Sequence, residues 1–369
     1  MRVVIAPDKF AGTLTAPQAA DAIGTGWRRR APLDDVVAAP MSDGGPGFVD
    51  VLHSAVGGDL AATNVTGPLG EQVPATLLLH DGTAYVESAH ACGLQLVAPT
   101  STDVECASTV GVGELVAAAL EWGACRIVVG LGGSATNDAG AGLLAALGAE
   151  ADADLRAGPR GFTDVTVVDL RPVRQRLAGV DLVLATDVDN ALLGMFGATK
   201  VYGPQKGLTD ERIQAVDAAL ERFVVAALGS GLAQRKVADS PGAGAAGGLG
   251  FALLAVGGRR QSGIELVAEA VGLRERVRAA DLVVTGEGSF DFSSRAGKVV
   301  HGVAAVALSA LRPCIVLAGQ VLIGSREMRA IGIESAYSMV DLVGSAAAFD
   351  DPEESLAALA ERAARTWSY

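Results

Sequence analysis

Short apolar strands alternate with helical segments at both ends of this chain. The first sixty residues predict, in order, a strand at Val3–Ala6, a helix at Pro17–Arg30 capped by Thr15, a strand at Val36–Ala39 and a helix at Gly47–Val56. The same rhythm returns near the C-terminus, with strands at Asp281–Thr285, Cys314–Ala318 and Ala336–Ser338, and helices at Gly297–Leu311 and from Pro352 onward. Apolar strands that alternate with helices are typical of parallel sheets covered on both faces. The two ends therefore predict one sheet of about five parallel strands.

The middle of the chain has a different pattern. Alternating apolar and polar residues at Ala75–Leu79 and Ala84–Glu87, bounded by Gly-Pro and Asp-Gly turns, predict antiparallel strands. A strand at Leu182–Thr186 and a helix at Thr209–Leu228, with Thr209 as its N-cap, follow. At 369 residues, two domains are expected. We predict an α/β protein in which residues 1–60 and 265–369 form a doubly wound, flavodoxin-like domain, and residues 61–264 form an inserted α/β domain with a mixed sheet.

Charge and composition exclude some kinds of partner. The net charge of −13 argues against a nucleic-acid surface, which needs clustered Lys and Arg, and against an anionic membrane. The longest uncharged run, Ser240–Gly258, contains seven glycines and a proline and is a poor membrane span. The four scattered cysteines lack metal-ligand spacing and are expected to be buried and reduced. We therefore expect a cytoplasmic protein, monomeric or homodimeric, that acts on small molecules.

The segment Arg126–Gly142 predicts a strand, a Gly-rich turn and the start of a helix. Such a turn directs backbone N–H groups and the positive end of a helix dipole at one point, which favours a phosphate or another anion. Gly130–Ala135 also fits a loose G-x-G-x-x-A dinucleotide pattern, but the polar stretch Gly148–Arg156 lacks the second strand that NAD binding requires. A phosphate is the favoured ligand, and a tight turn without a ligand is the alternative.

Charged residues follow several predicted strands. They are Asp8 and Lys9, Asp43, Asp187 and Asp189, and Glu287 and Asp291 with Lys298 beyond. Ligands bind at the carboxyl ends of parallel strands, and paired carboxylates can hold Mg²⁺ or accept a hydroxyl proton. Lys206 lies in a turn before a helix, where it could neutralise a phosphate or a carboxylate. For each of these residues, a solvated loop charge or a simple turn former is the alternative.

Further sequence patterns bear on which kinds of binding site the chain can contain. A second Gly-rich stretch, Pro241–Gly250, is interpreted as close helix packing rather than as another anion cradle. The sequence contains no G-x-x-x-x-G-K-[ST] motif, which excludes a P-loop enzyme. The four histidines have no metal-ligand spacing and are expected to be structural or exposed.

Taken together, these motifs resemble those of the bacterial glycerate kinase family from Val3 to about Ala364. The family begins with P-D-S-F-K-G-S-L-S, where this chain has Pro7–Thr15, and its A-D-G-G-E-G corresponds to Ser42–Gly47. Its G-G-S-A-T-N-D-G-G-A-G matches Gly132–Gly142 with one change, Ala139. Three motifs are matched in full: D-V-D-N from Asp187, Y-G-P-Q-K-G from Tyr202 and P-G-A-G-A-A-G-G-L-G from Pro241.

The chain also departs from the family pattern at two motifs. Lys9 and Ala11 stand where the family has serine and lysine. Ser289 and Ser293 replace an arginine and a glutamine, and Arg295 lies nearby. If the lost arginine bound the carboxylate of the substrate, the acceptor could differ from glycerate.

The resemblance implies a kinase that uses ATP and Mg²⁺ to phosphorylate D-glycerate, with 2-phosphoglycerate as the product. It implies that Gly132, Gly133, Ser134, Thr136 and Asn137 cradle a phosphate, and that Asp8, Asp43 and Asn190 contribute to the substrate site. Asp187 and Asp189 would hold Mg²⁺ or activate the hydroxyl, with Asp187 as the base. Glu287 and Asp291 would serve the metal or nucleotide, and Lys9, Lys206 and Lys298 would offset negative charge. The alternatives are a non-catalytic glycerate or nucleotide sensor and, less favoured, a dinucleotide-dependent oxidoreductase.

Overall fold

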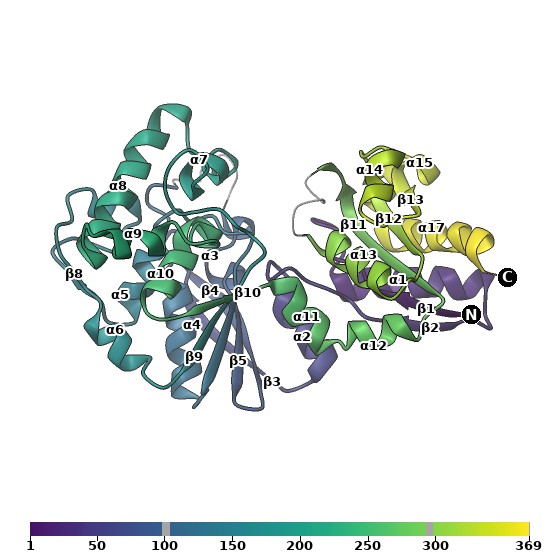
Figure 1. Ribbon diagram of the computed structural model, residues 1–369, viewed down its shortest axis with the longest axis horizontal. Helices are drawn as coiled ribbons and strands as arrows, with labels where there is room; N and C mark the ends of the chain where they lie inside the picture. Colours follow the sequence, from purple (N-terminus) through teal and green to yellow (C-terminus); the bar gives the residue numbers. More distant parts are fainter. Residues whose placement is uncertain (98–103, 293–297, 369) are drawn as a thin grey trace. The chain divides into compact units, whose positions relative to one another are not determined.

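The computed structural model describes residues 1–97, 104–292 and 298–368 (Figure 1). The chain forms two compact units. The first contains residues 1–43, 50–57 and 263–369, and the second contains residues 44–49 and 58–262. We propose that these units are the two domains expected from the sequence.

The first unit is built on a five-stranded parallel sheet. Its strands are β1 (Arg2–Ile5), β2 (Asp35–Ala38), β11 (Leu282–Phe290), β12 (Cys314–Val321) and β13 (Ser335–Ser338). Their order is β13-β12-β11-β1-β2, and every neighbouring pair is parallel. Numbered within this unit alone, the order is 2-1-3-4-5, which is the flavodoxin-like order with a topological switch between its first and third strands. The predicted doubly wound sheet is confirmed.

Helices cover this sheet. They are α1 (Ala16–Arg30), α11 (Gly263–Ala270), α12 (Leu273–Arg278), α13 (Val299–Ser309), α14 (Ser325–Ala330), α15 (Met339–Val343), α16 (Ser345–Asp350) and α17 (Pro352–Trp367). Thr15 begins α1 in a capping box with Gln18, which confirms the predicted start of this helix. Helices α1 and α17 approach closely at Gly26, where a Cβ atom would lie 1.8 Å from the carbonyl oxygen of Ala357. The predicted first residue of α13, Gly297, lies outside the described residues.

Strand β11 is longer than the sequence predicts. The apolar run ends at Thr285, but pairing with β12 continues as far as Phe290 and Val321. Glu287 and Ser289 therefore belong to a strand rather than to a loop after it. Polar residues are tolerated there because the backbone hydrogen bonds of β12 hold the strand.

The second unit contains a mixed sheet of six strands. They are β3 (Asp59–Thr66), β4 (Gln72–His80), β5 (Thr83–Glu87), β6 (Arg126–Gly130), β9 (Asp181–Ala185) and β10 (Arg259–Gln261), in the order β10-β9-β6-β5-β4-β3. The strands from β10 to β5 are parallel, and β4 is antiparallel to both β3 and β5. The mixed sheet and the antiparallel pair are confirmed. Strand β10, with the sequence Arg-Arg-Gln, has no apolar pattern that would predict it.

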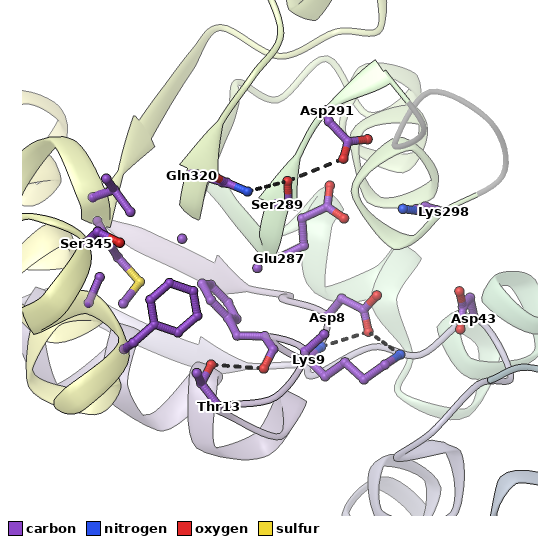
Figure 2. Close-up of a pocket in the computed structure, with 18 residues that line it drawn as sticks. Asp8, Lys9, Thr13, Asp43, Glu287, Ser289, Asp291, Lys298, Gln320 and Ser345 are labelled. Carbon is purple, nitrogen blue, oxygen red and sulfur yellow. Dashed lines mark hydrogen bonds and ion pairs between the residues drawn. The ribbon is translucent and has the colours of Figure 1, made fainter. Parts of the chain in front are cut away.

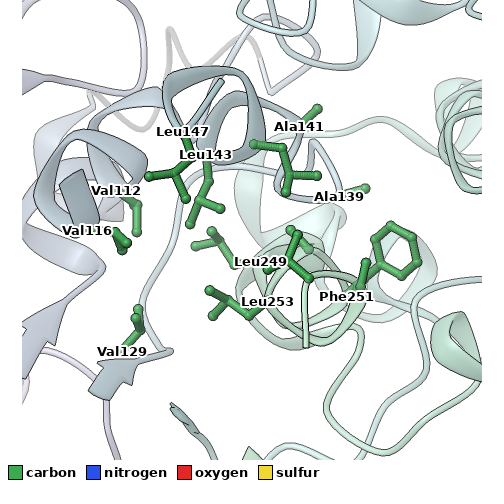
Figure 3. Close-up of a cluster of buried hydrophobic side chains, with 14 of the residues drawn as sticks. Val112, Val116, Val129, Ala139, Ala141, Leu143, Leu147, Leu249, Phe251 and Leu253 are labelled. Carbon is green, nitrogen blue, oxygen red and sulfur yellow. The ribbon is translucent and has the colours of Figure 1, made fainter. Parts of the chain in front are cut away.

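Most helices of the second unit lie in segments rich in alanine and glycine. They are α3 (Ala89–Cys92), α4 (Val110–Glu121), α5 (Ala141–Ala146), α6 (Arg171–Arg176), α7 (Ala198–Tyr202), α8 (Asp210–Leu228), α9 (Leu232–Ala238) and α10 (Leu249–Ala255). Helix α2 (Phe48–Val56) begins in this unit, and the short strands β7 (Glu150–Ala151) and β8 (Val168–Asp169) pair with each other. Figure 3 shows the core, where Val116 of α4, Leu143 of α5 and Leu253 of α10 gather near Val129 of β6.

The cysteines only partly follow the expectation of buried thiols. Cys92 and Cys314 are buried and Cys106 is half-buried, but Cys125 is exposed in the turn before β6. All four are free thiols. Across the described segments, no helix is long and apolar enough to cross a membrane.

Candidate active site

A pocket in the first unit is lined by six of the charged residues named as candidates from the sequence. It has a volume of about 410 Å³, and the six are Asp8, Lys9, Asp43, Glu287, Asp291 and Lys298. Figure 2 shows Asp291, Glu287 and Asp8 along one part of this pocket, with Lys298 beside them. The pocket lies at the carboxyl ends of β1 and β11, where the strand order of the sheet reverses. Ligands bind at this position in open parallel sheets.

Asp8 is a buried acidic group in this pocket, and its surroundings shift its pKa. Its side chain is buried, accepts a hydrogen bond of 2.8 Å from the backbone N–H of Lys9, and lies 3.7 Å from the Lys9 ammonium. Burial raises the pKa of the Asp8 carboxyl to about 6, and the positive charge of Lys9 opposes this shift. The Asp43 carboxylate raises the pKa further, and Lys298 lowers it. Such a carboxyl changes its charge near neutral pH.

A short chain of hydrogen bonds crosses the same pocket. Gln320 donates from Nε2 to the Ser289 hydroxyl at 3.2 Å, and that hydroxyl donates to the Asp291 carboxylate at 3.3 Å. Ser289 and Gln320 are adjacent because they pair directly in the register of β11 and β12. Sequence reasoning missed Gln320, since nothing in the sequence shows which residue of another strand lies beside Ser289. Ser293 and Arg295 lie outside the described residues.

In the second unit, Lys206 joins the Gly-rich segment. Its ammonium is buried and donates to the Ser134 hydroxyl at 3.0 Å and to the Thr136 carbonyl at 2.6 Å. Burial lowers the pKa of Lys206 to about 8, and the neighbouring Cys92 and Asp138 oppose that shift. Two motifs separated by about seventy residues are therefore held together by one cation.

The start of helix α5 is not open to an external anion. The buried Asp138 carboxylate accepts hydrogen bonds from Gly140 N at 3.1 Å, Gly142 N at 3.2 Å, and both Thr109 N at 2.9 Å and Thr109 Oγ1 at 2.8 Å. The next amide, that of Leu143, donates to Thr109 Oγ1 at 3.0 Å. These amides at the helix end are therefore not available to a phosphate, because a carboxylate of the protein already accepts their hydrogen bonds. The expectation that the segment from Gly132 to Asn137 binds a phosphate stays a prediction. Burial raises the pKa of Asp138, and its hydrogen bonds oppose that shift.

Helix α2 begins in a similar way. The buried Glu87 carboxylate accepts hydrogen bonds from Gly47 N at 3.0 Å and Val49 N at 3.3 Å. The end of the Ser42–Gly47 motif and the start of α2 are thus held by an acidic side chain at the end of β5. The sequence gives no sign of this pairing.

The other predicted phosphate residues pack closely against neighbouring residues of the second unit. A Cβ on Gly132 would lie 2.6 Å from the Cα of Gly45, and one on Gly133 would lie 2.8 Å from the Pro46 side chain. Asn137 is buried and donates to the Thr199 hydroxyl at 3.0 Å.

The second Gly-rich stretch packs in the same way. A Cβ on Gly247 would lie 1.9 Å from the carbonyl oxygen of Thr136, and one on Gly248 would lie 2.4 Å from the Cα of Ala139. The packing interpretation of the stretch from Pro241 to Gly250 is confirmed.

Asp187 and Asp189 follow β9 but engage different partners. Asp187 accepts a hydrogen bond of 2.6 Å from the Ser262 hydroxyl, while the largely exposed Asp189 forms an ion pair of 2.8 Å with Arg260. Asn190 is held by the Tyr202 hydroxyl, at 2.8 Å, and donates to the carbonyl of Phe196 at 2.8 Å. Among the described residues, no three His, Cys, Asp or Glu side chains are placed to hold a metal ion together.

Comparisons with known proteins give a consistent result. The model of the glycerate kinase family matches residues 3–368. A glycerate kinase of Bacillus subtilis is 40% identical, covering 99% of this chain and 96% of that protein. A glycerate 2-kinase of Escherichia coli is 40% identical, covering 94% of this chain and 92% of that protein. A crystal structure assigned as glycerate kinase 2 from Salmonella typhimurium has a TM-score of 0.80 at 36% identity, covering 99% of this chain and 98% of that one.

Proposed function

This chain belongs to the glycerate kinase family and is a kinase, and on that premise we propose that it transfers the terminal phosphoryl group of ATP to D-glycerate. We place the transfer on the 2-hydroxyl, because a relative similar over most of its length is named a glycerate 2-kinase. In this reaction the hydroxyl oxygen forms a bond to the γ-phosphorus as the bond to the bridging oxygen breaks. ADP leaves, and the hydroxyl proton passes to a base on the protein.

The pocket of the first unit is the observation that carries this proposal. Phosphoryl transfer needs positioned cations and carboxylates rather than a covalent nucleophile. Asp8, Glu287 and Asp291 supply the carboxylates, and Lys9 and Lys298 supply the positive charge, around one cavity. Ala11 stands in the pocket where the family has a lysine. Lys9 lines the same pocket and provides an ammonium group in its place.

The donor set fits a hard divalent cation. Carboxylate oxygens are the ligands that Mg²⁺ accepts in proteins, usually one or two together with phosphate oxygens and water. In the first unit we propose Glu287 and Asp291, which line one pocket, for this role. Asp187 and Asp189 are the candidate pair of the second unit, considered by itself. When bound, Mg²⁺ neutralises charge on the phosphates of the nucleotide.

Residues of the second unit have the remaining proposed roles. Asp187 is the proposed base, and the Ser262 hydroxyl orients its carboxylate through the 2.6 Å hydrogen bond. The segment from Gly132 to Asn137 is the proposed phosphate cradle, with Lys206 providing its positive charge. Because the end of helix α5 is occupied by Asp138, this cradle would depend on Lys206 and side-chain hydroxyls rather than on the helix dipole.

The decisive experiment is an ADP-release assay with ATP, Mg²⁺ and D-glycerate, run beside L-glycerate, glycolate and no acceptor. Release that depends on D-glycerate supports the proposal, and ³¹P NMR of the product distinguishes 2-phosphoglycerate from 3-phosphoglycerate. Absence of release with every acceptor, from folded protein that binds ATP, would refute the choice of acceptor. The cytoplasmic location and the oligomeric state stay predictions of the sequence.

A further inference from the structure

The pocket of the first unit has two ends of different chemistry. The charged end contains Asp8, Lys9, Asp43, Glu287, Asp291 and Lys298. The apolar end contains Phe10, Met339, Val340, Ala348 and Phe349. In Figure 2 the labelled Ser345 lies at the opposite side of the pocket from Lys298 and Asp43, which separates the two ends in space.

The apolar end combines fixed and exposed surface. Phe10 after β1 and Met339 at the start of α15 are almost fully buried, so they form a fixed wall. Phe349 of α16 lines the same pocket with 66% of its surface exposed. A flat apolar ligand group that covers this ring would remove apolar surface from water, which favours binding. Ser345 and Gln320 line the pocket too and offer hydrogen-bonding groups to a ligand.

The size and charge of the pocket limit the ligand. A cavity of about 410 Å³ lies in the range that holds drug-sized molecules and exceeds what a three-carbon acid would fill. A small hydroxy acid has no apolar part to cover Phe349. Lysines and carboxylates at the charged end suit a phosphate chain accompanied by a divalent cation. The ligand that matches both ends has a flat ring at one end and phosphates at the other.

We propose that this pocket is the nucleotide site of the enzyme, with the base at the apolar end against Phe349 and the phosphates at the charged end near Lys298. This inference rests on the proposed function, because it takes the phosphoryl donor to be a nucleoside triphosphate. It goes beyond that function by assigning the donor to the first unit and by naming Phe349 as a residue that contacts the base. The glycerate is then not the occupant of this pocket.

Direct binding measurements separate the two ends. Isothermal titration calorimetry with Mg²⁺ would use three probes: ADP, adenosine and inorganic tripolyphosphate. The substitution Phe349→Ala is expected to weaken ADP and adenosine about tenfold, or about 1.4 kcal/mol, and to leave tripolyphosphate unchanged. The substitution Lys298→Gln is expected to weaken ADP and tripolyphosphate and to leave adenosine unchanged.

A matched control removes an exposed apolar side chain elsewhere in the same unit. Leu33 is 96% exposed and does not line the pocket. Leu33→Ala should leave the binding of all three probes unchanged. Because Phe349 is itself largely exposed, Phe349→Ala should keep the fold, and its thermal melting curve checks this point.

The outcomes separate this inference from the proposed function. If ADP and adenosine bind Phe349→Ala as tightly as the original protein, or if the original protein binds neither, the inference is wrong. It is also wrong if Phe349→Ala weakens D-glycerate instead, since the pocket would then hold the acceptor. If ADP binding depends on Phe349 but no glycerate-dependent turnover occurs, the proposed function fails and the nucleotide site stands.

Discussion

Replacing Asp138 tests whether an acidic side chain of the protein, rather than a ligand, completes the start of helix α5. This carboxylate is buried and accepts four hydrogen bonds, from Thr109 N, Thr109 Oγ1, Gly140 N and Gly142 N. Asp138→Ala removes the acceptor of three backbone N–H groups that have no route to bulk water. The second unit is therefore expected to lose stability when this side chain is removed.

The expected size follows from these contacts. A buried donor without an acceptor costs about 1–3 kcal/mol, so three of them together would cost about 3–9 kcal/mol. Water can enter the polar space that the lost carboxylate leaves, which reduces the cost. We expect a loss of about 4 kcal/mol for Asp138→Ala, at the high end for a single substitution. For Asp138→Asn we expect about 2 kcal/mol, because the amide keeps one acceptor oxygen.

The assay must report on the second unit alone, since two units need not unfold together. Hydrogen exchange of the β6 amides at increasing urea concentration gives the free energy of unfolding of that unit. Asp152 is the matched control, because it accepts hydrogen bonds from Thr166 N at 3.0 Å, Val167 N at 3.1 Å and the Thr166 hydroxyl, but on the surface. Asp152→Ala should cost much less, since water replaces the lost acceptor. Equal losses at the two positions would refute the reasoning.

Three further predictions concern the buried cation, the proposed base and one close glycine contact. Activity should fall as pH rises through about 8, where Lys206 loses its proton in the folded state. The free energy of unfolding should instead rise between about pH 8 and pH 10.5, because the unfolded chain then binds more protons than the folded one. The pH dependence of kcat/KM measures the first effect, and that of the urea midpoint measures the second. Asp187→Asn should lower kcat more than about a hundredfold with an unchanged circular dichroism spectrum, and near-normal turnover would exclude Asp187 as the base. Gly247→Ala places a Cβ 1.9 Å from the Thr136 carbonyl oxygen at φ +67° and should both destabilise the second unit and abolish activity. Gly179→Ala, at φ +85° with nothing within 4 Å, should cost only about 1 kcal/mol in the same urea titration.

The order of strands and helices at the two ends could be read from the sequence because it depends on local patterns. A parallel strand between two layers of helices must be apolar, so Val3–Ala6 and Cys314–Ala318 are recognisable without their neighbours. The cap at Thr15 is equally local, since Gln18 completes it within one helical turn. Strand β10 was missed because its pairing with β9 holds a polar segment in the sheet. The extension of β11 to Phe290 was missed for the same reason.

The candidate site likewise has features that the sequence could predict and features that it could not. The sequence by itself determined which residues could do chemistry, since a carboxylate or lysine at a strand end is visible in the chain order. Only the tertiary structure decided that Asp8 and Lys298 share a pocket and that Asp138 occupies the helix end predicted for a phosphate. The physical reason is distance along the chain: strand pairing, close packing and burial join residues far apart in sequence. The local sequence around a residue does not show which distant residues will surround it in the fold. The pKa of Lys206 and the exposure of Phe349 depend on those distant residues.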